Sequence, residues 1–334
     1  MNRDLENNTS DVVLAEKIHT AFTKIRDEIA KVIVGQDEIV EQLLISLFSR
    51  GHCLLVGVPG LAKTLLIRTL GQILDLQFSR IQFTPDLMPS DITGTEILEE
   101  DRTTGQKAFR FIKGPLFANI ILADEINRTP PKTQSALLEA MQEYRVTAAG
   151  QTFTLDEPFF VLATQNPIEQ EGTYPLPEAQ LDRFMFSLWL DYPPFGQEVE
   201  IVKRTTTDTK PVVSPVLSKS EIIDFQRLLR RVPVADNVVE YAVKLVAYTR
   251  GGNGNDNRIN EWIRWGAGPR ASQYLIVAAK VRAILQNRFT PEIEDIRALV
   301  MPVLRHRIIL SYSAEAESMT VEKIIEYIVE KIAE

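Results

Sequence analysis

Eight consecutive residues have the composition of a phosphate-binding loop. They are Gly57, Val58, Pro59, Gly60, Leu61, Ala62, Lys63 and Thr64. An apolar run precedes them and an amphipathic run starts at Leu65, so the order is strand, glycine-rich loop, helix. In this context backbone N–H groups and a helix N-terminus surround phosphates. Lys63 would reach the β- and γ-phosphates and the Thr64 hydroxyl would hold Mg²⁺, although an ordinary strand–turn–helix corner also fits the pattern.

One position of this loop departs from the common pattern G-x-x-x-x-G-K-S/T. Ala62 stands where the second glycine is usual. A Cβ atom disfavours a positive φ, so we expect Ala62 to be tolerated only if its φ is negative. A positive φ at this residue would contradict that expectation.

Two acidic residues end an apolar run further along the chain. The run 119–123 leads into Asp124 and Glu125. This is typical of a buried parallel strand, and ligands gather at the carboxyl ends of such strands. Beside a phosphate loop, Asp124 would bind Mg²⁺ through water and Glu125 would polarise the attacking water. A strand that merely ends in two solvated acids explains this pattern equally well.

The bulk composition is that of an ordinary soluble protein. The chain has 334 residues, of which 45% are hydrophobic and 25% charged, which is enough for two domains. Its net charge of −8 argues against a general nucleic-acid-binding protein. The single cysteine, Cys53, cannot form an internal disulfide and favours a reducing compartment. Since we find neither a signal peptide nor a membrane-spanning run, we expect a cytoplasmic protein without membrane insertion.

Strands and helices alternate in the first part of the chain and predict an α/β core around a five-stranded parallel sheet. Two segments, 94–112 and 145–155, have the pattern of β-hairpins inserted into this core. Residues 1–10 look disordered. The expected helices are 12–32, 37–49, 65–74, 132–143 and 177–182, and the expected strands are 53–56, 77–83, 119–124, 159–164 and 184–190.

The pattern becomes helical after Pro193 and Pro194 and stays so to the end. We therefore predict three parts: an N-terminal helical segment at 1–34, the α/β core at 35–195, and an all-α domain at 196–334. The expected helices of the last part are 196–205, 219–231, 237–249, 271–286, 291–304 and 321–332.

With these pieces in place, the chain resembles the AAA+ ATPases, and among them the MoxR family, over almost its whole length. The family tolerates alanine before the lysine of the phosphate loop, so Ala62 becomes a mark of membership. The hairpin at 94–112 is similar to the helix-2 insert of this clade, and the hairpin at 145–155 to the one before sensor 1. The segments that carry the resemblance are 57–64, 117–143, 163–167, 181–184 and 268–272.

The resemblance implies a role for each matching residue of the core. Lys63 and Thr64 are similar to the Walker A pair, and Asp124 and Glu125 to the Walker B pair. Asn166 resembles sensor 1, which orients the attacking water or senses the γ-phosphate. The segment that would line the adenine pocket consists of Ile33, Val34, Gly35 and Gln36.

Two arginines resemble the cationic residues that complete such a site. Arg270 is similar to sensor 2, reaching the phosphates from the helical lid, although an arginine at a helix N-terminus that pairs with a nearby acid also fits. Arg183 resembles the arginine finger that serves a neighbouring subunit's nucleotide, a task that suits a permanently charged, forked side chain. Arg128 and Arg204 remain alternatives for the finger. The pair at 306–307 could belong to a lid surface or a subunit contact.

The implied activity is Mg²⁺-dependent ATP hydrolysis by a self-assembling protein, expected as a hexameric ring. The implied role is chaperone-like: maturing or activating partner proteins, often ones with a von Willebrand factor A domain, and often inserting metal cofactors. A nucleic-acid motor, a magnesium-chelatase-like motor subunit and a non-catalytic nucleotide switch stay open. The acidic net charge, with only Arg102 and Lys107 as basic residues at the hairpin tip, weighs against nucleic acid. The presence of both Asp124 and Glu125 weighs against a switch.

Overall fold

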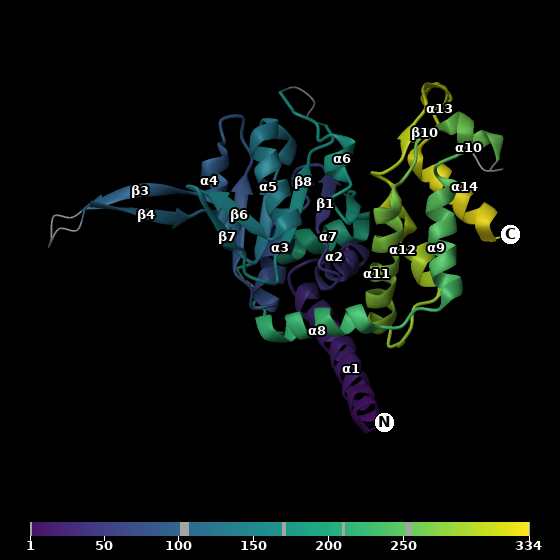
Figure 1. Cartoon of the computed structure of the whole chain (residues 1–334), viewed down its shortest axis with the longest axis horizontal. Coiled ribbons are helices and arrows are strands. Elements are labelled where there is room, and N and C mark those ends of the chain that lie inside the picture. Colours follow the sequence, from purple (N-terminus) through teal and green to yellow (C-terminus); the bar gives the residue numbers. More distant parts are fainter. Residues whose placement is uncertain (1, 101–106, 169–171, 209–210, 252–255, 334) are drawn as a thin grey trace.

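A five-stranded sheet forms the centre of the core (Figure 1). Its strands are β1 (Cys53–Gly57), β2 (Phe78–Gln82), β5 (Ile120–Asp124), β8 (Phe160–Gln165) and β9 (Phe186–Leu190). They lie in the order β2-β5-β8-β1-β9 and every neighbouring pair is parallel. This confirms the predicted parallel sheet. The computed structural model of the chain describes residues 2–100, 107–168, 172–208, 211–251 and 256–333.

Alternate residues of each strand enter different hydrophobic cores on the two faces of the sheet. Leu55 belongs to the core that contains helices α2 (Asp37–Phe48) and α3 (Lys63–Ile73). Leu54 belongs to the core that contains α5 (Pro131–Glu143). Burial on both faces explains why these strands are continuous apolar runs in the sequence.

Three neighbouring strands bring the candidate residues to one edge of the sheet. The order β5-β8-β1 places the carboxyl ends of these strands side by side. The loop 57–64 follows β1, the two acids end β5, and Asn166 follows β8. Short helical turns, η2 (Ile126–Arg128) and α6 (Glu178–Leu181), then carry the chain away from this edge.

Helix α1 (Asn2–Ala30) begins ten residues earlier than the sequence pattern predicts. Residues 2–10 contain neither proline nor glycine, so nothing in their covalent structure interrupts a helix. Their prediction as disordered is therefore wrong for this structure. Further along the helix, Ile18, Ile25 and Ile29 are buried in the core that α1 shares with α3.

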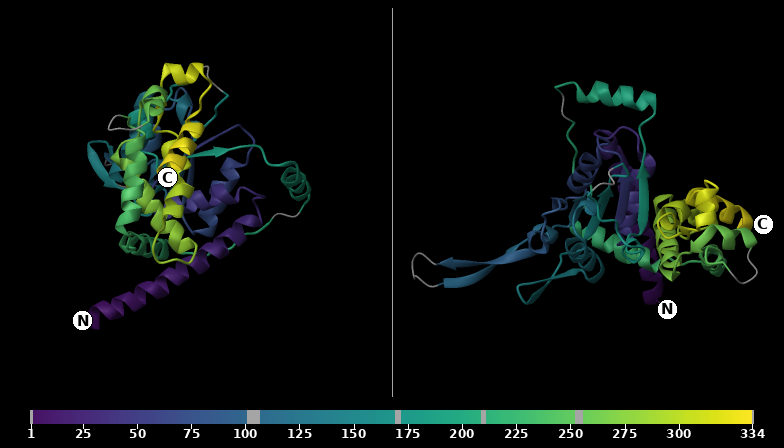
Figure 2. Two further views of the ribbon diagram at one scale, coloured as in Figure 1. Left: turned by 90° about the vertical axis from the view of Figure 1, so that its right-hand side faces the viewer. Right: turned by 90° about the horizontal axis from the view of Figure 1, so that it is seen from above.

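Both predicted hairpins are confirmed. Strands β3 (Gly94–Glu100) and β4 (Lys107–Lys113) pair in antiparallel register and extend far from the core, as Figures 1 and 2 show. Strands β6 (Arg145–Ala148) and β7 (Gln151–Thr154) form the second, shorter hairpin. The two hairpins touch through stacked rings of Phe111 and Phe153, with centroids 4.3 Å apart. The long hairpin thus leaves the core from a fixed base.

In the described residues after 195, the regular structure is helical apart from one small antiparallel pair, β10 (Ile263–Trp265) with β11 (Ile309–Leu310). This pair and two short helices were missed because they span too few residues to show a period. The helices in this last part of the chain are α7 (Phe195–Thr205), α8 (Lys219–Arg231), α9 (Asp236–Tyr248), α10 (Asn257–Trp262), α11 (Pro269–Leu285), α12 (Ile293–Leu304), α13 (Tyr312–Ala316) and α14 (Val321–Ala333).

Helix α8 packs against helices α1 and α2 of the first part of the chain, and the helices that follow it form the lid. Its Gln226 side chain donates a hydrogen bond of 2.8 Å to the Leu47 carbonyl of α2. Helices α9 to α14 then form the lid on the right of Figure 1, where α11 packs against α1 and α2 and α12 packs against β9. The division of the chain at residues 34 and 195 stays a prediction. Among the helices in the described ranges, none has both the length and the apolar character needed to cross a membrane.

Candidate ATP site

The loop between β1 and α3 has the backbone of a phosphate cradle. A Cβ atom on Gly57 would lie 2.9 Å from the Leu190 carbonyl of neighbouring β9, so only glycine fits there. Gly60 has a φ of +89°. Lys63 Nζ donates to the Gly57 carbonyl at 2.5 Å and so crosses the loop. Burial lowers the pKa of Lys63, while the negative charges of the Asp124 and Glu125 carboxylates oppose this shift.

The expectation of a negative φ at Ala62 is wrong. Ala62 has φ +58° and ψ +21°, in the left-handed region. The residue caps α3, and its carbonyl accepts the first helical hydrogen bond from Leu66 N–H at 2.9 Å. The tight entry into the helix requires this conformation, which costs an L-residue about 1–2 kcal/mol. Alanine therefore occupies the position in a strained conformation.

Asp124 is held by two side chains that the sequence did not single out. Thr164 of β8 donates its hydroxyl to Asp124 Oδ1 at 2.6 Å. Arg80 of β2 donates to Asp124 Oδ2 at 2.7 Å. The same Thr164 oxygen accepts the Glu125 N–H at 2.9 Å. One buried hydroxyl thus orients both members of the acidic pair.

Glu125 lies in the left-handed region, with φ +57°, directly after the strand. Its Oε2 accepts a hydrogen bond from Gln82 Nε2 at 2.9 Å and another from Arg128 Nη1 at 2.9 Å. Both contacts are made by Oε2, so the other carboxylate oxygen, Oε1, can accept a hydrogen bond from a water. Asn166 lies at the same sheet edge, where its Oδ1 accepts the N–H of Ile168 at 3.2 Å.

The segment before α2 offers a polar atom that an adenine could pair with. Gly35 and Gln36 both have positive φ, +69° and +61°, which turns the chain sharply into the helix. The side chain of Gln197 from α7 fills the space that a Cβ on Gly35 would need. Gln36 Oε1 is buried and has no hydrogen-bond partner among the described residues. An unpaired buried acceptor is costly, so this segment fits a nucleotide that brings a donor.

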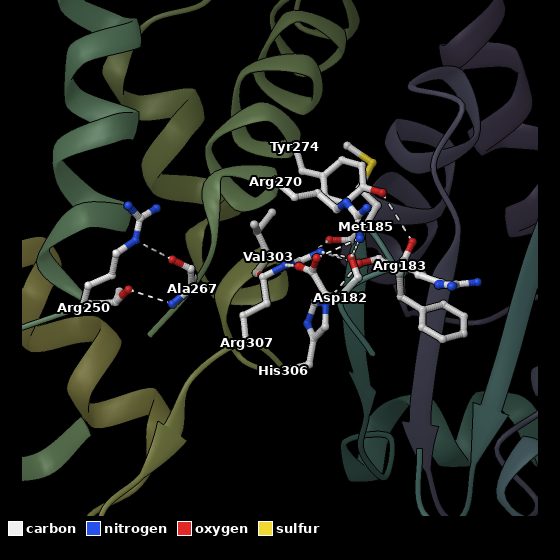
Figure 3. A network of polar contacts seen from close by, with 12 residues as sticks. Asp182, Arg183, Met185, Arg250, Ala267, Arg270, Tyr274, Val303, His306 and Arg307 are labelled. Atoms are coloured by element: carbon white, nitrogen blue, oxygen red, sulfur yellow. Dashed lines mark hydrogen bonds and ion pairs between the residues drawn. The ribbon is translucent and has the colours of Figure 1, made fainter. Parts of the chain in front are cut away.

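Arg183 and Arg270 lie together, away from the phosphate loop. Both line a cavity of about 250 Å³ that Arg50 and Arg230 also line. Arg183 Nη1 donates to the Leu138 carbonyl at 2.8 Å. Arg270 Nη1 pairs with Asp182 Oδ2 at 2.8 Å (Figure 3). None of the described residues that line this cavity belongs to the loop 57–64, so Arg270 is grouped with Arg183 and not with Lys63.

The residues missed by sequence analysis share one property: their partners come from other segments of the chain. Arg80 and Gln82 alternate along β2, but only the sheet order shows that β2 lies beside β5. Thr164 lies inside one of the segments that carry the family resemblance, and that position was the one available signal. In the described part of the chain, no group of three or more His, Cys, Asp or Glu side chains could hold a metal by itself.

Comparisons with known proteins cover the core, the lid and the whole chain. Residues 52–186 match the ATPase family associated with various cellular activities (AAA), and residues 255–328 match the AAA lid domain. Chaperone MoxR1 of Mycobacterium tuberculosis is 44% identical over 96% of this chain and 84% of its own length. The protein MoxR of Methylorubrum extorquens is 30% identical, covering 87% of this chain and 88% of its own. A crystal structure of a Cytophaga hutchinsonii protein assigned as an ATPase has a TM-score of 0.90, 43% identity and 98% coverage of both chains.

These similarities are not confined to the phosphate loop. They extend from the start of the core to the end of the lid and include a solved structure with the same fold. The family resemblance inferred from the sequence is thereby confirmed. The chain belongs to the MoxR family of AAA+ ATPases, which hydrolyse ATP.

Proposed function

We propose that the protein is a Mg²⁺-dependent ATPase whose sites are completed by a neighbouring subunit in a ring, which we expect to be a hexamer. One observation carries this proposal. The phosphate loop and the acids lie at the sheet edge, whereas Arg183 and Arg270 line a separate cavity beside Asp182. A single chain thus holds two halves of a site that do not meet within it. Assembly would bring the arginines of one subunit to the nucleotide of the next.

The residues at the sheet edge can divide the work of phosphoryl transfer. Thr64 and Asp124 would hold Mg²⁺, which neutralises charge on the phosphates. Lys63 would leave the Gly57 carbonyl for the phosphate oxygens, and Asn166 would orient the attacking water. Glu125 would accept a hydrogen bond from that water and draw its proton away during attack. The contacts of Thr164 with Asp124 and Glu125 support this arrangement, because they fix both groups at one edge.

Among the three arginines considered for the finger, Arg183 has the geometry that fits best. Arg128 is paired with Glu125 of its own chain at 2.9 Å. Arg204 is paired with Glu200 at 2.7 Å and also donates to the Ala30 carbonyl. Arg183, by contrast, bonds a backbone carbonyl through one nitrogen and lies beside Arg270 in the cavity. Two adjacent guanidinium groups suit the charge that spreads over a γ-phosphate in the transition state.

The biological role that we propose is chaperone-like remodelling of partner proteins, including partners with a von Willebrand factor A domain. The similarity to a protein named Chaperone MoxR1 supports this role. The long hairpin adds exposed apolar side chains, with Leu98 56% and Phe109 72% exposed, as a contact for a protein client needs. Arg110 and Lys107 of the same hairpin are paired with Glu99 and Glu100. This pairing argues against a nucleic-acid motor, while Arg102, the other basic residue of the hairpin tip, lies outside the described residues.

Two experiments test the proposal. Lys63→Ala should abolish binding in a titration with a fluorescent ATP analogue, and unchanged affinity would remove the phosphate-loop assignment. Arg183→Ala should lower kcat on the order of 10³-fold. A mixture of Arg183→Ala and Lys63→Ala subunits should recover activity, because the intact loop of one variant meets the intact finger of the other. Arg204→Ala, alone and mixed, is the matched control, and absence of recovery with Arg183→Ala would contradict the shared site.

A further inference from the structure

Arg307, just after α12, is a lid residue whose side chain is buried against the core (Figure 3). Its side chain is 2% exposed. The residue belongs to a pair that the sequence left open between a lid surface and a subunit contact. The structure assigns it to neither, because its guanidinium points inward, to the segment that joins α6 to β9. That segment, 182–185, carries Arg183.

Every N–H group of the Arg307 guanidinium has an acceptor. Nε donates to Asp182 Oδ1 at 2.8 Å. Nη2 donates to the Asp182 carbonyl at 3.1 Å and to the Phe184 carbonyl at 2.6 Å. Nη1 donates to the Met185 carbonyl at 3.3 Å and to the Val303 carbonyl. The rigid fork of arginine is needed to reach five acceptors at once, and a lysine with three donors on a flexible stem cannot replace it.

Lid side chains bond four successive backbone carbonyls of the core. Arg307 donates hydrogen bonds to the carbonyls of Asp182, Phe184 and Met185, as described above. The remaining carbonyl, that of Arg183, accepts the hydroxyl of Tyr274 from α11 at 3.3 Å. His306 Nε2 lies 3.0 Å from the Phe184 carbonyl and adds a second contact there. The backbone on both sides of Arg183 is therefore held by the lid.

The contacts of Arg307, Tyr274 and His306 with the carbonyls of residues 182–185 form a clamp on this backbone segment. The carboxylate of Asp182 joins this clamp to Arg270. Oδ1 accepts from Arg307 and Oδ2 from Arg270, both at 2.8 Å. The ring of Tyr274 lies under Arg307, with the guanidinium carbon 5.2 Å from the ring centroid. These contacts connect Arg183 and Arg270, which line the same cavity, through groups that share one buried guanidinium. A shift of Arg307 would move both arginines.

We propose that Arg307 is a positioning residue for ATP hydrolysis. It fixes segment 182–185 to the lid, so that Arg183 and Arg270 face the neighbouring subunit's nucleotide as one rigid pair. This inference rests on the shared site proposed above. In this proposal the lid and Arg183 move together as one unit. A change at Arg307 does not directly alter the phosphate loop of the same chain.

If the clamp positions Arg183 and Arg270, a variant of Arg307 should have a defective arginine finger and an intact phosphate loop. Arg307→Lys should bind a fluorescent ATP analogue as the wild type does, because its own phosphate loop is intact. Its kcat should fall on the order of 10²-fold, as expected when a catalytic group is displaced by about 1 Å. Mixed with Lys63→Ala subunits, which carry an intact finger, Arg307→Lys should recover activity. Mixed with Arg183→Ala subunits it should not, because every site then receives a defective finger.

Two further variants separate positioning from simple stabilisation. Arg288→Lys is the matched control, because Arg288 also pairs with a buried acid of the lid, Asp295, at 2.6 Å, away from segment 182–185. It should keep its kcat at a temperature where it is folded. Tyr274→Phe keeps the ring under Arg307 and removes only the bond to the Arg183 carbonyl. It should show a smaller loss with the same mixing pattern, and it decides the question if Arg307→Lys does not fold.

The outcomes are distinct. Recovery with Lys63→Ala but not with Arg183→Ala supports the clamp. Recovery with Arg183→Ala, or a kcat of Arg288→Lys that falls together with that of Arg307→Lys, overturns it and leaves Arg307 as a structural residue. If the Arg183→Ala and Lys63→Ala mixture recovers activity while the Arg307→Lys and Lys63→Ala mixture does not, the clamp alone is wrong. If the Arg183→Ala and Lys63→Ala mixture fails as well, the shared site itself is wrong.

Discussion

The phosphate-loop edge and the Arg183–Arg270 cavity are two halves of one proposed site, yet they are built differently. At the edge, each functional residue lies at the end of a strand, directly after a strand or at the start of a helix, and the parallel sheet brings them together. Next to the cavity, Asp182 of the core bonds Arg270 and Arg307 of the lid, which lie 88 and 125 positions further along the chain. The first half needs only the core to be folded. The second half also needs the lid to be docked. With the proposed shared site, the position of the lid would therefore control hydrolysis without contacting the loop that binds the nucleotide.

The largest expected effect comes from breaking the edge at its chemical centre. Glu125→Gln removes the carboxylate that would polarise the attacking water and keeps the shape of the side chain. We expect kcat to fall by about 10²–10⁴-fold, with ATP binding retained. Steady-state phosphate release together with a nucleotide titration measures the two effects separately. Turnover close to that of the wild type would exclude Glu125 as the general base.

A smaller effect should follow from loosening the edge without removing a catalytic group. Thr164→Val is nearly isosteric and deletes the hydroxyl that contacts both Asp124 and the Glu125 N–H. We expect a loss of about 10–100-fold in activity, as for other residues that orient a metal ligand. Thr152→Val, at an exposed position of the second hairpin, is the control. If the two variants have equal activity, the sheet edge does not depend on Thr164.

The smallest expected effect is on the free energy of unfolding, and it comes from the backbone conformation of the phosphate loop. Ala62→Gly should relieve the left-handed strain, while a glycine loses more entropy on folding. The balance favours glycine by roughly 0.5–1 kcal/mol in the free energy of unfolding. Denaturant unfolding of the nucleotide-free protein measures this difference. A destabilised Ala62→Gly variant would show that the methyl group makes contacts worth more than the strain.

Local patterns predicted most elements because their periods extend over many residues. All five core strands and both hairpins were found with ends displaced by a few residues at most. The N-terminal part of α1, the short helices α4 (Pro89–Thr93), α10 and α13, and the β10–β11 pair were not. A two- or three-residue strand has no alternation to read, and its pairing with a segment more than forty residues away is decided by the lid's own packing.

The sequence by itself predicted which residues lie at the phosphate-loop edge. Lys63, Asp124 and Asn166 each follow an apolar run, and the ends of parallel strands necessarily share one edge of a sheet. Only the tertiary structure decided the positive φ of Ala62, the contacts of Thr164, and the grouping of Arg270 with Arg183. It also decided that Arg307 is buried beneath segment 182–185. An arginine is buried only where enough acceptors converge on it, and here those acceptors come from segments that meet when the lid docks on the core.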